Sequence, residues 1–114
     1  MIPEGLHDLM SRKGILAAVV VSLESGEKAV LGNRASLESD YALRTLFDDL
    51  AVTEIEKYLE GQILPRIVQQ GKVCGVICKP GGKAIVGLYY HDQRDVVQRY
   101  QFSKELDAEV CALW

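Results

Sequence analysis

The alternation of apolar and polar positions is most informative near the start of the chain. Apolar residues follow one another without interruption over 15–21, within the segment ILAAVVVSL, and such a valine-rich run is typical of a central strand covered on both faces. Before this run, residues 6–14 carry apolar side chains at helical spacing and end in glycine, which predicts a short first helix. After it, a glycine-containing turn at 24–27 leads into a predicted second strand at 28–32.

A long helical pattern follows, from residue 36 to about residue 60. Its apolar residues recur at helical spacing, and Gly61 is the predicted stop. The segment 36–60 carries seven acidic and two basic residues, which gives a local charge of −5. An acidic helix face is ordinarily solvated; otherwise it favours a basic partner surface.

Three candidate strands come next, at 63–69, 73–79 and 83–90. The first is the weakest, because Pro65 lacks a backbone donor and confines a strand to an edge or makes it irregular. The other two are joined by Pro-Gly-Gly at 80–82, which predicts a hairpin turn.

The tail from about residue 93 to residue 113 is predicted to be mostly a final helix, although its middle segment VVQRYQF is equally compatible with a strand. The predicted fold class is therefore α+β. A single antiparallel sheet of about five strands is sandwiched between helices, in the order α-β-β-α-β-β-β-α, within one domain spanning residues 1–114.

Composition and charge narrow the function classes. A length of 114 residues fits one domain, and a net charge of −3 argues against a nucleic-acid protein, which usually carries a basic stripe. The longest apolar run has seven residues, whereas a membrane helix needs about 20. Three cysteines without a recognisable signal sequence favour a reducing cytoplasm. We therefore expect a cytoplasmic protein without a membrane-inserted segment.

The layout and the segment KGILAAVVVSLESGEKAVLG resemble the roadblock family, the small dynein light-chain-like domains that in bacteria and archaea are partners of Ras-like GTPases. The later segment GKVCGVICKPGGKAIVGLYYHD, followed by a final helix, also fits the bacterial members. Longin and profilin-like domains share related layouts. The roadblock resemblance implies a homodimer, or a heterodimer with a related chain, in which second strands pair edge to edge and long helices pack together. It also implies a scaffold or GTPase-regulating role without chemistry.

The residues themselves point to the same surface. The second strand is an edge unless another chain pairs with it, and the long helix has apolar side chains beyond the arc of about 100° that a one-sided helix needs. The alternative is that Leu37 and Tyr41 pack under a loop. The predicted dimer or partner interface comprises Lys28, Val30, Leu31, Leu37, Tyr41, Arg44 and Asp48.

The cysteines offer little chemistry. In a strand, Cys74 and Cys78 share a face but lie roughly 13 Å apart, because a strand rises about 3.3 Å per residue. That separation excludes a disulfide and a shared zinc site, so both are interpreted as buried thiols. Cys111 has no partner motif and is also interpreted as a packing residue.

Other polar candidates have plainer explanations. His91 beside Asp92 resembles an Asp-oriented general base, but a strand end followed by Asp92 as a helix cap explains the same residues, and no nucleophile elbow is present. The glycines of 79–83 suit a hairpin turn better than an anion cradle, and Trp114 is either a docking anchor or simply the last residue. We expect no enzymatic activity, cofactor or metal. Two other functions stay open: a small-ligand sensor of profilin-like type, and an enzyme that uses His91 or a cysteine.

Overall fold

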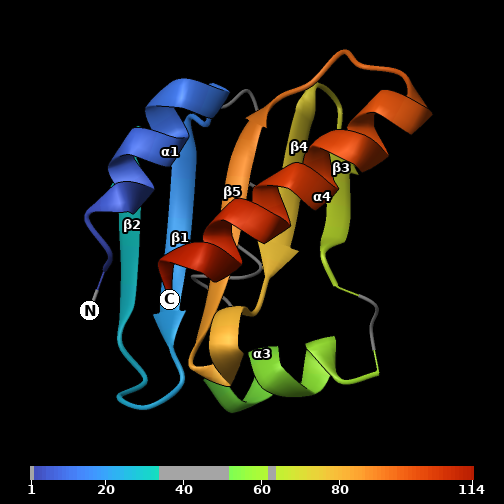
Figure 1. Cartoon of the computed structure of the whole chain (residues 1–114). Helices are drawn as coiled ribbons and strands as arrows, with labels where there is room; N and C mark the ends of the chain where they lie inside the picture. The colour runs from blue at the N-terminus through green and yellow to red at the C-terminus, as the bar shows by residue number, and fades with distance from the viewer. Residues whose placement is uncertain (1, 34–51, 62–63) are drawn as a thin grey trace.

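One antiparallel sheet with helices on both faces organises the chain (Figure 1). The computed structural model describes residues 2–33, 52–61 and 64–114. In chain order the elements are α1 (Gly5–Lys13), β1 (Ala17–Ser22), β2 (Lys28–Gly32), α3 (Val52–Leu59), β3 (Arg66–Gln70), β4 (Val73–Cys78), β5 (Ala84–His91) and α4 (Val96–Leu113). The predicted helix at 36–60 is described only over α3, and its earlier part lies outside the described residues.

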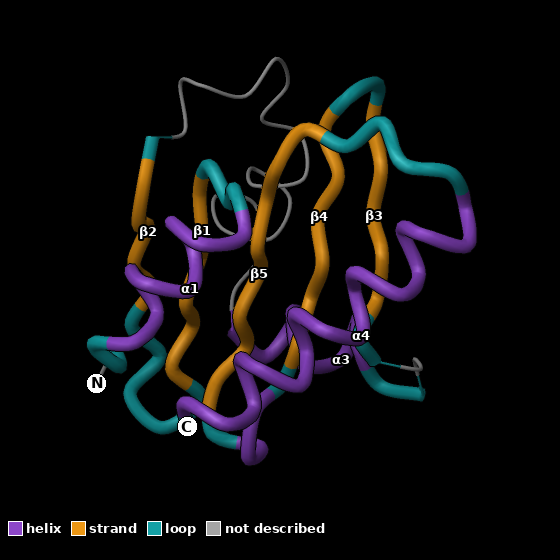
Figure 2. Tube along the Cα trace, turned by 45° about the horizontal axis from the view of Figure 1, so that its top comes forward, coloured by secondary structure: helices purple, strands orange, loops and turns teal. Residues whose placement is uncertain are grey.

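The five strands lie in the order β2-β1-β5-β4-β3, and every neighbouring pair is antiparallel. All six residues of β1 are buried, because β1 sits between β2 and β5 with helices over both faces. The apolar run therefore forms the covered inner strand that the sequence predicts. β2 and β3 end the sheet on opposite sides (Figure 2).

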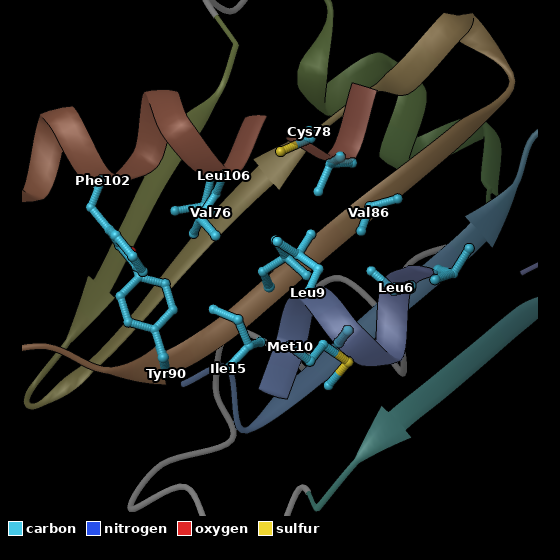
Figure 3. Close-up of a cluster of buried hydrophobic side chains, with 14 of the residues drawn as sticks. Leu6, Leu9, Met10, Ile15, Val76, Cys78, Val86, Tyr90, Phe102 and Leu106 are labelled. Atoms are coloured by element: carbon cyan, nitrogen blue, oxygen red, sulfur yellow. The ribbon is translucent and has the colours of Figure 1, made fainter. Parts of the chain in front are cut away.

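Two apolar cores result, one on each face of the sheet. On the first face, Leu6 and Leu9 of α1 and Leu106 of α4 reach down onto the strands (Figure 3). On the second face, Ile55 of α3 packs in the same cluster as the fully buried Tyr89 of β5. The alternating side chains of each strand supply both cores.

Glycine ends the first helix as the sequence predicts. Gly14 adopts a left-handed conformation with φ of 70°, and its backbone N–H donates to the carbonyl of Met10. This geometry is nearly cost-free for glycine and satisfies a carbonyl at the helix end. It turns the chain directly from α1 into the segment that leads to β1.

The beginning of α4 confirms one expectation, the final helix, and corrects another, the residue that caps it. The segment VVQRYQF is helical, because Phe102 and Leu106 are buried at helical spacing. The helix cap is Asp95, whose side chain accepts a hydrogen bond from the Gln98 N–H at 2.8 Å, so the prediction that Asp92 caps the helix is wrong. Both aspartates precede the helix, and only the one adjacent to its first residue can reach the free N–H groups.

The weakest strand of the sequence exists as β3, which begins directly after Pro65 and forms an edge of the sheet. The hairpin between β4 and β5 is also confirmed, as a short turn at Pro80–Gly82. Gly81 and Gly82 have φ values of 60° and 66°, a region that favours glycine.

Candidate interface at the edge of β2

Strand β2 ends the sheet, and of the described residues none pairs with its outer side. Its inner side pairs with β1 in a fixed register, in which Val30 lies opposite Val19 and Leu31 lies opposite Ala18. The outer N–H and C=O groups of such a strand are suited to pairing with another chain.

The register divides the predicted contact residues of β2 between the two faces of the sheet. Val30 shares the face of Val19, which belongs to the core under α3, and it is 37% exposed. Leu31 shares the face of Ala18 and packs, half-buried, against the core under α1. Val30 is thus the apolar side chain of β2 that is exposed and can contact a partner strand.

Lys28 lies opposite Val21 and therefore on the same face as Val30. It is half-buried. Four further residues of the predicted interface, Leu37, Tyr41, Arg44 and Asp48, lie outside the described residues, and their role stays a prediction.

The end of β2 depends on a glycine at a close approach. Gly32 has φ of 81°, and a Cβ atom at this position would clash with the backbone carbonyl of Leu16. The next residue, Asn33, donates its N–H to that same carbonyl at 2.9 Å. Gly32 and Asn33 therefore hold the end of β2 against the residue that precedes β1.

A hollow of about 230 Å³ lies beside this edge. Its lining residues are Ile2, Val20, Ser22, Glu27, Lys28 and Ala29. Ligand pockets usually occupy about 300–1,000 Å³ and hold a few convergent polar groups. A second hollow, of about 410 Å³, lies beside α3, between Thr53 and Lys79.

Two of the three cysteines, Cys74 and Cys78, are placed as the sequence predicts. Cys74 and Cys78 are buried in β4, and both are free thiols. Burial raises the pKa of each thiol, so neither is a ready thiolate at neutral pH. Cys111 is exposed, so the expectation that it is a packing residue is wrong.

His91 and Asp92 do not form the imagined dyad. His91 is exposed, whereas the Asp92 side chain is fully buried. One carboxylate oxygen of Asp92 accepts from the Arg94 N–H at 2.9 Å and from the Arg94 guanidinium at 3.0 Å. The other oxygen accepts from Arg99 at 3.3 Å. Burial alone would raise the pKa of Asp92, but the bonds from Arg94 and Arg99 outweigh it and hold the pKa below the ordinary 3.8.

This buried carboxylate is the polar feature that sequence reasoning missed. It ties the loop after β5 to the first turns of α4, and Arg99 extends the link by donating to Gln69 of β3 at 2.8 Å. The signal in the sequence is two arginines, two and seven residues after an aspartate. Trp114 is half-buried and packs against the first core.

The described residues include neither a cluster of metal ligands nor a membrane-spanning helix. Across 2–33, 52–61 and 64–114, no group of three or more His, Cys, Asp or Glu residues is arranged to hold a metal ion. Within the same ranges, no helix has the length and apolar character needed to cross a membrane.

Comparison with known proteins defines the fold. No protein-family profile matches the sequence, and no curated protein matches it significantly. Among solved structures, MglB of Myxococcus xanthus matches with a TM-score of 0.55 and 9% sequence identity, over 92% of this chain and 87% of that chain. The chain therefore has a roadblock-like α+β fold.

Proposed function

We propose that this roadblock-like chain is a non-enzymatic interaction module that dimerises through the edge of β2 and binds or regulates a small Ras-like GTPase. The observation that carries the dimer is the exposed Val30 on an unextended sheet edge. In the proposed dimer, the β2 strands of two chains pair and join the two sheets into one. The pairing covers the edge of each chain, which could otherwise pair non-specifically with other strands.

The GTPase part of the proposal rests on the roadblock resemblance and on the structural likeness to MglB. The same fold hosts different functions, so the GTPase has to be demonstrated by binding. The hollow beside β2 is smaller than most ligand pockets, so it does not favour a small ligand at this edge, whereas the hollow of about 410 Å³ beside α3 falls within the range of ligand pockets.

The dimer is tested by the solution mass of the full chain at tens of micromolar. We expect twice the chain mass of 12.6 kDa for the wild type and the chain mass itself for Val30→Asp, because a buried carboxylate without a partner opposes association. Val97→Asp is the matched control, since Val97 is an exposed valine on α4 and its replacement leaves β2 intact. A wild-type monomer, or a Val30→Asp dimer, refutes the proposed interface.

The GTPase is tested by capture from the native cell with wild-type and Val30→Asp chains as paired baits. We expect a Ras-like GTPase to be enriched on the wild-type bait and depleted on the variant, if the partner contacts the assembled dimer. Direct binding of the purified GTPase, loaded with GDP or a GTP analogue, then measures the preference for one nucleotide state. Absence of any GTPase from both baits contradicts this part and leaves the dimer result standing.

A further inference from the structure

The hollow of about 410 Å³ beside α3 has the volume of a small-ligand pocket. Its described lining residues are Thr53, Lys57, Leu59, Glu60 and Lys79. The first four come from α3 and its end. The last one precedes the turn that joins β4 to β5, and this turn lies at the same end of the sheet as α3 (Figure 1). Two segments that are distant in the sequence therefore border one hollow.

Helix α3 divides its side chains between the core and the hollow. Ile55 and Leu59 are four residues apart and are buried in the second core. Thr53 and Lys57 are also four residues apart, and both are exposed. At about 100° per residue, Lys57 lies about 160° around the helix from Ile55, so polar side chains occupy the flank away from the core. Leu59, which also lines the hollow, gives it an apolar floor.

Lys79 borders the hollow from the other side. Its two chain neighbours, Cys78 and Pro80, are both buried, and the Lys83 N–H donates to the Pro80 carbonyl at 3.1 Å. The backbone at Lys79 is therefore held on both sides, and Lys79 itself is half-buried. An ammonium group that loses part of its water without gaining a partner raises the free energy of the folded chain, and a bound anion offsets that cost.

The charges of the lining favour an anion. In the part of the chain that the structure describes, no acidic side chain pairs with Lys57 or Lys79. Glu60 is the one acidic residue among the described lining residues, so two lysines and one glutamate give the lining a charge of +1. Thr53 adds a hydroxyl group, which can donate to a ligand oxygen. The hollow thus offers donors from two separate elements to one anionic group.

We propose that the hollow beside α3 binds a small organic anion. Its carboxylate or phosphate group lies between the ammonium groups of Lys57 and Lys79 and accepts from the Thr53 hydroxyl, and its apolar part lies over Leu59. Hydrogen bonds between an ammonium group and an anionic oxygen are roughly twice as strong as neutral ones, so the two lysines supply most of the affinity. The hollow contains no residue of β2, and the proposal is therefore independent of the dimer.

Three probes of similar shape test the charge requirement: benzoate, phenyl phosphate and the uncharged benzyl alcohol. Each is titrated into the full chain at low salt, where electrostatic attraction is least screened, and backbone amide shifts are followed by NMR. We expect saturable shifts from an anionic probe, centred on residues 53–60 and 79–82, and no saturation by benzyl alcohol. Binding of both anions shows that a carboxylate suffices, whereas binding of phenyl phosphate alone identifies a phosphate ester.

Four single variants then locate the bound anion. Lys79→Gln is expected to weaken binding at least about 10-fold, and Lys57→Gln about 3-fold because Lys57 is exposed. Glu60→Gln is expected to tighten binding about 3-fold, because it removes a like charge from the lining. Lys83→Gln is the matched control and keeps wild-type affinity, since Lys83 is an exposed lysine that follows the same turn and does not line the hollow.

Circular dichroism with thermal unfolding checks that all four variants remain folded. The proposal is overturned if neither anion saturates by about 10 mM, or if benzyl alcohol binds as tightly as the anions. It is also overturned if Lys83→Gln weakens binding as much as Lys79→Gln, which would show a diffuse attraction, or if Glu60→Gln weakens it. None of these results bears on the mass of the wild-type chain or of Val30→Asp, so the dimer is judged separately.

Discussion

Replacing Asp92 with asparagine tests whether the buried carboxylate holds α4 in place. The wild-type carboxylate accepts three hydrogen bonds, two from Arg94 and one from Arg99. Asparagine keeps one acceptor oxygen, which can still take the Arg94 N–H, but it loses the charge and the second acceptor. Since a hydrogen bond to a charged group contributes about 1.5–3 kcal/mol, we expect a loss of about 2 kcal/mol in the free energy of unfolding. For a domain of this size that corresponds to a fall in Tm of about 10 °C.

The effect of pH on the stability difference between wild type and Asp92→Asn tests the same role of the carboxylate more sharply. The pKa of Asp92 in the folded chain lies below its ordinary 3.8, so the stabilisation is complete well above that value and is lost as the pH falls through the folded pKa. Urea unfolding, followed by the fluorescence of the single tryptophan, Trp114, is to be measured from about pH 7 down to about pH 2. The gap between wild type and Asp92→Asn should narrow as the wild-type carboxylate is protonated.

Asp95→Asn is the matched control, because asparagine caps a helix about as well as aspartate and the expected change is a few tenths of a kcal/mol. If Asp92→Asn lowers the free energy of unfolding by no more than this control, the buried carboxylate does not hold α4 in place. That role is equally refuted if the difference between wild type and Asp92→Asn stays constant throughout the acid range.

Two further predictions concern the packing of the sheet and the exposure of the cysteine thiols. Gly75→Ala places a Cβ atom 2.6 Å from the buried ring of Tyr89, so we expect the free energy of unfolding, measured by chemical denaturation, to fall by about 1–3 kcal/mol. When Tyr89 is also replaced by leucine, the loss caused by Gly75→Ala should be well below that range. An equal loss in both backgrounds contradicts the contact. A thiol-specific reagent is expected to label Cys111 in the native chain and Cys74 and Cys78 only in denaturant, and native labelling of all three thiols contradicts the described burial.

Much of the fold follows from short stretches of sequence with a single interpretation. The run at 15–21 is too apolar for any strand with a solvated face, so its central position was predictable. Gly14 was equally clear, because it permits a left-handed helix end. Pro65 left two interpretations, an edge strand or an irregular segment, and the structure has the edge strand. These signals act locally and need no knowledge of the rest of the chain.

The features that sequence reasoning missed depend on contacts between elements. Asp92 and Asp95 are both good capping residues, and only the position of the first helical turn decides between them. The valines at 96 and 97 suggest a core or a strand when their neighbours are unknown. They are exposed because α4 extends past the sheet, and the length of that overhang is set by packing along the whole helix.

The candidate interface was predictable only in part. The edge position of β2 followed from the order of elements, and the structure places β2 at the end of the sheet. The division of Val30 and Leu31 between opposite faces required the register with β1. A one-residue shift in that register would exchange the two faces, and the sequence alone does not specify it at this edge.

Amide hydrogen exchange of β2 tests the edge-to-edge dimer most directly, because pairing protects the outward N–H groups of the edge strand itself. At tens of micromolar, we predict that the outward N–H groups of Lys28–Gly32 exchange slowly in the wild type and fast in Val30→Asp, whereas the N–H groups bonded to β1 are protected in both. The other edge, Arg66–Gln70, serves as an internal reference and should exchange alike in both proteins. Fast exchange of the outward N–H groups of Lys28–Gly32 in the wild type, equal to that of Val30→Asp, would contradict the edge-to-edge dimer.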